Sequence, residues 1–287
     1  MDQFNFKVLT VNRNKNKFFG VDYFANFCDG SHQTFKYFSS SVDELAVFKD
    51  EMVGLNQFKY EIFKTEIANL EPGRIIGIFQ NPDLYSTSDS IGFIIEELKK
   101  FRLGLFLETN SDKIIDDIER LVEFSKELPL LIAIPISTFS SPILNIFGEN
   151  TSLEKATKMI QKLADANINV GIIYKPLIPK INDNLEDLAK IIDKAQSLNI
   201  KFIYPSFTLY FDSFKLKNFY DIIEKEKPEL KNYYFDKYGL KYSWESDNLG
   251  ELKKILVFNS KKRDLKYAMK DIINLYRNDA YIQLKLF

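Results

Sequence analysis

The stretch from residue 151 to residue 183 constrains the fold of this chain more than any other. Thr151 and Glu154 have the spacing of a capping box, in which each side chain accepts a hydrogen bond from the other residue's backbone N–H. Apolar residues then recur at helical spacing, so one face of the predicted helix must be buried. A short apolar run rich in β-branched residues follows at 170–174, as is typical of a strand covered on both faces. Helix and buried strand together form one unit of an α/β fold.

Two prolines and a second capping pattern end this strand and begin the next helix. Pro176 and Pro179 follow the strand, and proline has no N–H with which to extend a ladder of hydrogen bonds. Asp183 and Glu186 then have the spacing of a helix start. We therefore expect the next helix over residues 183–198.

The same unit recurs along the chain, giving six strand regions that are each followed by a helix. The strands are predicted at 21–27 with a short run at 34–38, then at 75–79, 103–107, 130–136, 170–174 and 201–204 continued by 207–209. The helices are predicted at 41–70, 88–101, 111–128, 151–167, 183–198 and 215–226. Strict alternation of apolar strands with helices predicts a parallel sheet covered by helices.

Two architectures contain such units, an open doubly wound sheet and a barrel that does not close. In both, the functional end lies at the carboxyl ends of the strands. No glycine-rich phosphate-binding motif follows any predicted strand, which weakens an interpretation as a nucleotide-binding fold.

The composition of the sequence changes after Pro228, where an aromatic and polar stretch precedes two predicted helical stretches. We predict two domains, a barrel-like domain over residues 1–227 and a helical C-terminal extension over 228–287 that packs on it. The aromatic residues of the extension have the rings needed to stack on nucleic-acid bases, but packing onto the barrel is the favoured use. They are Tyr233, Tyr234, Tyr238, Tyr242 and Trp244.

Charge and cysteine content limit the class of protein. The formal net charge of −1 provides no global positive field to attract nucleic acid or membrane. One cysteine, Cys28, excludes an internal disulfide and a metal site made of cysteines alone. The N-terminus lacks the features of a signal peptide, and no apolar run is long enough for a membrane-spanning helix. We expect a soluble, cytoplasmic protein.

Several stretches, in their order along the chain, resemble the radical S-adenosylmethionine (radical SAM) enzymes of the spore photoproduct lyase-like family. They are FGVDYFANFCDGSH, LETNSDKIIDDIERL, NINVGIIYKPLIPKINDN, PSFTLYFDSFKLKNFY and the terminal QLKLF. The resemblance implies a partial (β/α)6 barrel of the TIM type and an ancestral lyase activity on DNA photoproducts. It also implies two cofactors in the family, a [4Fe–4S] cluster and S-adenosylmethionine.

This chain departs from the family at the residues that carry the chemistry. The family holds its cluster on a C-x-x-x-C-x-x-C loop, because the irons need thiolates and one iron stays open for the cofactor. Cys28 matches the third of these cysteines, and the other two have no counterpart. Asn110 replaces a family lysine, while Ala156 and Tyr210 stand where arginines are expected. We therefore expect a degenerate member with a vestigial cluster loop, no catalytic residue, no metal and no cofactor.

Polar residues at the predicted carboxyl ends of the strands are the candidates for a binding site. In a barrel they would converge on one mouth, where a small ligand could lie among them; the alternative is that they cap strand ends and bond loop backbone. They are Gln80, Asn81, Glu108, Thr109, Asn110, Ser137 and Lys175. A second polar group is expected only to form an exposed, solvated helix face, and consists of Asp112, Asp116, Asp117 and Glu119.

The terminal QLKLF resembles the short peptide by which bacterial DNA-processing proteins bind the replicative sliding clamp. The resemblance implies that Gln283 bonds the rim of the clamp pocket, while Leu284, Leu286 and Phe287 fill its apolar part. Lys285 departs from the usual Ser or Asp. Packing of this tail against the core of the same chain is the equally open alternative.

Three functions follow from these observations. The first is a cluster-free, non-catalytic binding or accessory protein linked to DNA repair or replication, with the sliding clamp as partner; the net charge does not support DNA itself as a partner. The second is an enzyme that uses the barrel mouth for non-radical chemistry on a small molecule, or a protein that still binds S-adenosylmethionine. The third, direct repair of DNA by this chain, is the weakest because the arginines are missing.

Overall fold

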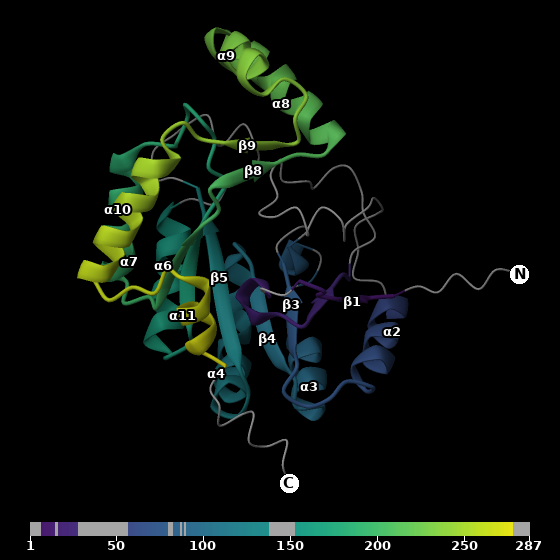
Figure 1. Ribbon diagram of the computed structural model, residues 1–287. Helices are drawn as coiled ribbons and strands as arrows, with labels where there is room; N and C mark the ends of the chain where they lie inside the picture. The colour runs from purple at the N-terminus through teal and green to yellow at the C-terminus, as the bar shows by residue number, and fades with distance from the viewer. Residues whose placement is uncertain are drawn as a thin grey trace, which may run out of the picture.

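The computed structural model describes residues 7–14, 17–27, 57–79, 83–86, 88, 90–137 and 153–277. Within them the main element is a sheet of seven strands whose spatial order follows the sequence (Figure 1). β1 runs antiparallel to β2, and every later pair is parallel. The strands are β1 (Leu9–Val11), β2 (Tyr23–Ala25), β3 (Ile75–Ile78), β4 (Gly104–Glu108), β5 (Leu130–Ile136), β6 (Val170–Tyr174) and β7 (Phe202–Pro205).

The sequential strand order decides between the two architectures that the sequence left open. A doubly wound sheet reverses its strand order at a switch point, whereas this sheet adds each parallel strand on the same side. The order is therefore that of a barrel wall. No strand pairing among the described residues joins β7 to β1, so the wall stays open.

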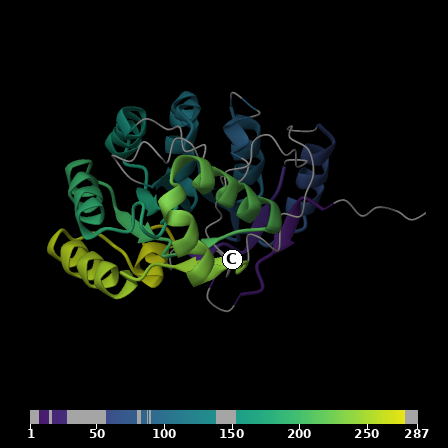
Figure 2. The same ribbon diagram turned by 90° about the horizontal axis from the view of Figure 1, so that it is seen from above.

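Helices cover the outer face of this wall (Figure 2). They are α2 (Gln57–Ile67), α3 (Gly92–Lys100), α4 (Ile118–Glu127), α6 (Leu153–Asp165), α7 (Leu185–Ser197) and α10 (Leu249–Lys262). α10 packs on α7. Short 3-10 helices are η1 (Phe18–Gly20), η2 (Leu84–Ser86) and η3 (Asp112–Asp117). No helix in the described ranges combines the length and the apolar character needed to cross a membrane.

Alternation along the strands separates two cores. Leu105 and Leu107 of β4 belong to the core between the sheet and the helices. Phe106 between them belongs to a second core on the inner face of the wall, together with Leu131 and Ala133 of β5. Because both faces are buried, these strands are apolar throughout, which is why they could be predicted from the sequence.

Aromatic rings fill the inner core. The ring of Phe19, a residue in η1 with φ 48°, stacks on Phe106 at a centroid distance of 4.6 Å. The ring of Phe79 also packs on Phe106, at a centroid distance of 5.0 Å. Gly171 in β6 makes room for Phe202, since a Cβ at this position would lie 2.4 Å from the phenyl ring. Side chains of the described residues thus pack the part of the interior around Phe106.

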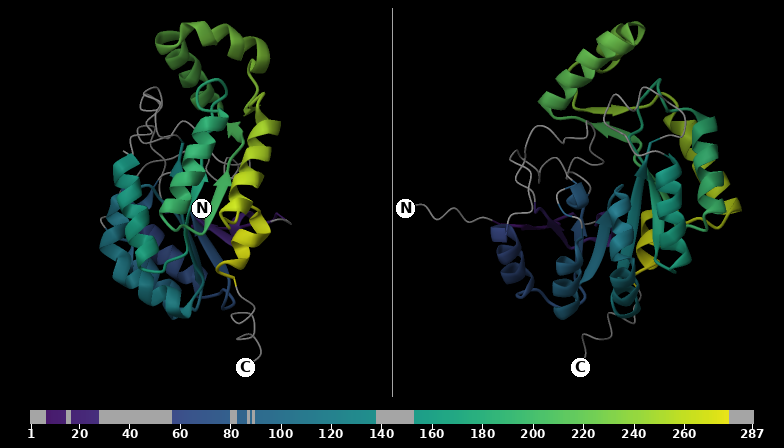
Figure 3. Two further views of the ribbon diagram at one scale, coloured as in Figure 1. Left: turned by 90° about the vertical axis from the view of Figure 1, so that its left-hand side faces the viewer. Right: turned by 180° about the vertical axis from the view of Figure 1, so that it is seen from behind.

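A second sheet follows directly after the wall. β8 (Thr208–Tyr210) pairs antiparallel with β9 (Ser243–Glu245), and α8 (Ser213–Glu226) and α9 (Pro228–Tyr238) connect them. The prediction that residues 207–209 continue the last strand of the main sheet was therefore wrong. β7 ends at Pro205, which has no N–H to extend the ladder, and the chain then leaves the wall. Figure 3 shows the green α8–α9 hairpin beyond the carboxyl ends of the strands in both views.

The α8–α9 hairpin has its own aromatic core, which includes Phe219 from α8 and Tyr234 from α9. The Trp244 ring stacks on Tyr238 at 4.6 Å with an interplanar angle of 10°. Tyr234, Tyr238 and Trp244 are buried in this packing and so cannot stack on bases, whereas Tyr242 is exposed. The division of the chain at residue 228 remains a prediction.

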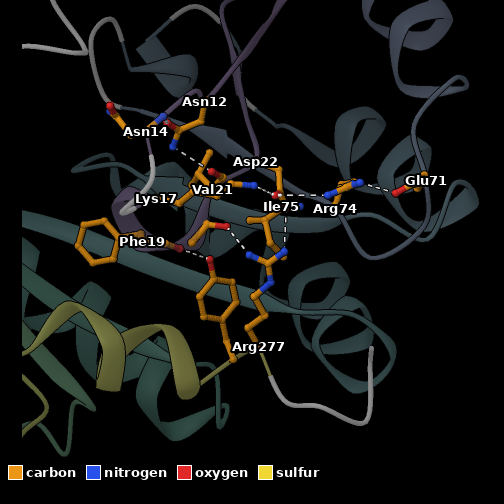
Figure 4. Close-up of polar contacts among 12 residues, drawn as sticks. Asn12, Asn14, Lys17, Phe19, Val21, Asp22, Glu71, Arg74, Ile75 and Arg277 are labelled. Atoms are coloured by element: carbon orange, nitrogen blue, oxygen red, sulfur yellow. Dashed lines mark hydrogen bonds and ion pairs between the residues drawn. The ribbon is translucent and has the colours of Figure 1, made fainter. Parts of the chain in front are cut away.

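A charged cluster closes the amino end of the wall (Figure 4). The buried carboxylate of Asp22 accepts hydrogen bonds from the backbone N–H of Ile75 at 2.9 Å and from Nη2 of Arg277 at 3.0 Å. Lys17 pairs with the other carboxylate oxygen, and Arg74 lies 3.9 Å from it. The segment after α11 (Met269–Asn274) is thereby tied to residues near the start of the chain.

Candidate functional site

Two inward-facing charged residues meet at the carboxyl end of the wall. Glu108 lies two residues after Phe106, and Lys175 lies two residues after Ile173, so alternation turns both side chains inward. Nζ of Lys175 lies 2.8 Å from Oε1 and 2.9 Å from Oε2 of Glu108. The side chain of Glu108 is 1% exposed and that of Lys175 is 14% exposed. The structure thus joins two of the predicted mouth residues, from β4 and the end of β6, across β5.

Burial makes the two charges dependent on each other. Taking a carboxylate out of water costs several kcal/mol unless a partner compensates for the lost hydration. The ammonium of Lys175, which contacts both carboxylate oxygens, provides that compensation. Lys175 keeps the larger exposed fraction, so its end of the pair is the one that faces solvent.

Ser137 is a third predicted mouth residue, and its backbone carbonyl binds the loop after β6. Its carbonyl accepts a hydrogen bond of 2.7 Å from Nδ2 of Asn182, which also donates to the carbonyl of Pro176 at 2.8 Å. Oδ1 of Asn182 accepts from the N–H of Ile178 at 2.6 Å. Sequence reasoning missed Asn182; the only signal was an amide side chain in a proline-rich loop, where it can satisfy backbone groups.

Thr109 and Asn110 hold neighbouring loops together. Oγ1 of Thr109 and the backbone N–H of Asn110 both donate to Oδ2 of Asp83, at 2.7 and 3.0 Å. The other oxygen of Asp83 accepts from the N–H of Tyr85 at 3.1 Å. Thr109 follows inward-facing Glu108 and is fully buried, so it points away from the mouth. Oγ1 of Thr109 also accepts from the backbone N–H of Ser111 at 3.1 Å, so these two residues bond the loops around them.

The prediction that the acidic residues at 112–119 form a wholly exposed face was wrong for Asp117. Asp112, Asp116 and Glu119 are exposed, but Asp117 is fully buried. Its carboxylate accepts hydrogen bonds from the Tyr85 hydroxyl, Ser90 Oγ, the N–H of Ile91 and Nη1 of Arg120, at 3.0, 2.6, 2.8 and 2.9 Å. Ile91 is the N-cap residue of α3, where an anion is favoured by the unpaired amides. Burial, and secondly the charge of Asp117, raises the pKa of Tyr85.

The start of α7 also differs from the prediction. Its N-cap is Asn184, whose Oδ1 accepts from the N–H of Asp187 at 2.8 Å, rather than Asp183. Asp183 is buried instead. It accepts from the N–H of Lys180 at 2.8 Å and from the hydroxyl of Ser246, which links the loop after β6 to the segment between β9 and α10.

The remaining predicted site residues lie outside the described residues. They are Cys28 of the vestigial cluster loop, Gln80 and Asn81 of the mouth, and Gln283, Leu284, Leu286 and Phe287 of the tail. Ligand binding at the mouth and clamp binding by the tail both stay predictions.

The donor set of the chain does not fit a [4Fe–4S] cluster. A cubane cluster with one open iron needs three thiolates, and the whole sequence contains one cysteine. This chain alone therefore cannot hold the cluster that the resemblance implies.

Comparison with known proteins gave little further information. No protein-family model matches the chain, and no curated protein matches it. Among solved structures, it is similar to one described as native anSMEcpe with bound AdoMet, at 12% sequence identity and a TM-score of 0.43. The match covers 82% of this chain and 65% of that chain, which is less than two thirds of its length. A TM-score this low supports no conclusion about fold or activity, so the site is interpreted from its own geometry.

Proposed function

We propose that this chain is a cluster-free, radical SAM-like partial barrel that acts as a non-catalytic binding or accessory protein. Three features support the proposal. The six parallel strands follow one another around the wall, as in a partial (β/α)6 barrel. The sequence stretches quoted above resemble the spore photoproduct lyase-like family, and one cysteine is too few for its cluster.

The observation that carries the proposal is the filling of the barrel. Phe19 and Phe79 both pack on Phe106 in the interior of the wall. Just beyond them, the charges of Glu108 and Lys175 neutralise each other. Such an interior stabilises a scaffold, and in the proposed role binding takes place at the outer surfaces and in the loops at the carboxyl ends of the strands. A link to DNA repair or replication rests on the family resemblance and on the QLKLF tail.

Anaerobic reconstitution tests the loss of the cluster. The full-length protein is incubated with iron and sulfide, and iron, sulfide and visible absorbance are then measured for the original chain and for Cys28→Ala. We expect both proteins to retain the same low, sub-stoichiometric iron. One cluster per chain in the original protein, lost in Cys28→Ala, would overturn the proposal.

The Glu108–Lys175 pair favours an alternative function, an enzyme that uses the mouth for non-radical chemistry or a protein that retains S-adenosylmethionine binding. A carboxylate and an ammonium side by side are groups suited to proton transfer and to holding a zwitterionic ligand. Calorimetric titration of the original protein and of Lys175→Gln with S-adenosylmethionine tests this. Lys190→Gln, on the exposed face of α7, is the matched control. Binding that is lost only in Lys175→Gln would support the alternative, and no binding by the original protein would count against retained S-adenosylmethionine binding.

The partner that we propose for the accessory role is the bacterial sliding clamp. Binding of the full-length protein to the clamp is compared with that of a Gln283→Ala, Phe287→Ala double variant. The expected result is loss of binding in the variant. Equal binding by both proteins would remove the tail from the proposal without affecting the cluster-free barrel.

A further inference from the structure

A groove at the surface has the lining of a ligand site. It lies between η3 and α6, which pack against each other, and its volume is about 640 Å³. Pockets that hold small molecules span roughly 300–1,000 Å³. The groove is therefore large enough for a ligand of nucleotide size.

One wall of the groove is cationic. Lys155, Lys158 and Lys162 of α6 line it, and their spacing places all three on one face of the helix. At 1.5 Å per residue the row is about 10 Å long. Lys158 also pairs with Glu154 at 2.6 Å, beside the row, so its charge is partly offset. A row of ammonium groups of this length matches a chain of two or three phosphates better than a single anion.

The rest of the lining has different chemistry. Asp112 and Asp116 of η3 also line the groove, and their charge favours a phosphate chain that lies along α6. Their carboxylates would accept hydrogen bonds from hydroxyl or amino groups of a ligand. Ile115 and Met159 contribute the apolar part of the lining, against which a ring can pack. Lys113 and Gln161 complete the lining. The four lysines outnumber the two aspartates of the lining, and Glu154 beside Lys158 offsets part of this excess.

We propose that this groove binds a nucleoside di- or triphosphate. The phosphates lie along Lys155, Lys158 and Lys162, the ring lies on Ile115 and Met159, and hydroxyl or amino groups of the ligand face the two aspartates. Such a site binds phosphate through side chains rather than through a glycine-rich loop. The sequence therefore contains no phosphate-binding motif that would indicate it. None of the lining residues belongs to the predicted mouth, so the site does not depend on the proposed function.

Calorimetric titration of the full-length protein with ATP, AMP and inorganic tripolyphosphate tests the site. We expect ATP to bind more tightly than AMP, which has a shorter phosphate chain, and more tightly than tripolyphosphate, which has no ring. Higher salt should weaken ATP binding, since the lysine row is exposed. Tripolyphosphate binding as tightly as ATP, or no ATP binding at millimolar concentration, would overturn the proposal.

A pair of variants assigns the binding to the groove. Lys155→Gln, Lys162→Gln removes two charges from the row and should weaken ATP binding by about tenfold or more, as expected for two lost charged contacts. Lys190→Gln, Lys254→Gln removes two charges from the exposed faces of α7 and α10 and should leave it unchanged. All four residues are exposed, and equal thermal unfolding midpoints would verify that both variants fold. An equal loss in both variants, or binding restricted to single-stranded oligonucleotides, would contradict a nucleotide site.

Discussion

Asp22 is a buried carboxylate that three cationic side chains approach. It is 2% exposed, whereas Lys17, Arg74 and Arg277 are between 26% and 34% exposed. The acid is therefore the desolvated member of the cluster, and the cations keep part of their hydration. Its contact with Arg277 joins residues that are 255 positions apart in the sequence.

Asp22→Asn should lower the free energy of unfolding by about 2–3 kcal/mol. A buried charge contact that loses one member costs about 3–5 kcal/mol, and the partial exposure of the cations reduces this value. Glu71→Gln is the control, because Glu71 pairs with Arg74 but is 67% exposed, and it should cost less than about 0.5 kcal/mol. Urea unfolding measures both. Similar losses in the two variants would show that burial of Asp22 is not the source of the effect.

Two glycines should respond to alanine with opposite signs. A Cβ on Gly171 would lie 2.4 Å from the Phe202 ring in a packed core, so Gly171→Ala should cost about 1–3 kcal/mol. Gly250 in α10 has no atom within 4 Å of that position, so Gly250→Ala should add about 0.5 kcal/mol through higher helix propensity. Thermal unfolding midpoints of the two variants and the original protein measure these changes. A stabilising Gly171→Ala would mean that the inner core is loosely packed.

Single residues of the candidate site could be predicted from the sequence, but not their partners. Glu108 and Lys175 were found because each follows a buried strand. Their contact depends on the register of β4, β5 and β6, which no local pattern encodes. Strand alternation alone could have shown that Thr109 points away from Glu108. Asp83 gave no signal of its role, since it acts through contacts with a distant loop.

At the scale of elements, the cap of α7 offers a direct test. Asn184→Ala should cost about 1 kcal/mol, because the N–H of Asp187 loses its acceptor. Asn184→Ser retains a capping oxygen and should cost only a few tenths of a kcal/mol. Denaturant unfolding of the two variants provides the comparison. If serine is as destabilising as alanine, the side chain stabilises the loop by some means other than capping.

Element prediction succeeded where burial is complete and failed where pairing is short. The strands from β3 to β6 are continuous apolar runs bounded by helices, and the sequence located them to within a residue or two. β1 and β9 have three residues each, which is too short for a periodic pattern, and β8 was located to within one residue but assigned to the wrong sheet. Their strand character comes from a partner distant in sequence, as in the pairing of Leu209 with Trp244.

For the whole molecule, the alternation of strands and helices predicted the class of fold but left its winding open, and the family resemblance alone implied a partial barrel. Alternating strands and helices fit both a barrel wall and a doubly wound sheet, because each unit is locally the same in the two. The two folds differ in the side of the sheet on which each new strand is added. The aromatic residues of the inner core contribute to that choice. Phe19, Phe79, Phe106 and Phe202 meet only if the wall curves around them.

Four buried tyrosines connect the stability of the whole molecule to alkaline pH. Burial is the first cause that raises the pKa of Tyr85, Tyr174, Tyr234 and Tyr276 above the ordinary value of 10. Each hydroxyl donates a hydrogen bond, to Asp117, Asn182, Pro179 and Phe19 respectively, and a tyrosinate could not donate. The acceptors lie at both ends of the wall, so the ionisation of these groups requires the loss of much of the structure.

A pKa raised in the folded state gives stability that is complete below the unfolded pKa and is lost as pH rises above it. Each such tyrosine removes about 1.4 kcal/mol per pH unit above 10, so four remove about 5–6 kcal/mol per unit. A domain with about 5–15 kcal/mol of stability should therefore unfold cooperatively about one to three units above pH 10. Tyrosinate absorbance and far-ultraviolet circular dichroism, followed together, test this. Part of the absorbance should rise only with the loss of helix signal, and Tyr276→Phe should reduce that part by the contribution of one tyrosine. Complete ionisation with an intact helix signal would show that these hydroxyls are accessible in the native fold.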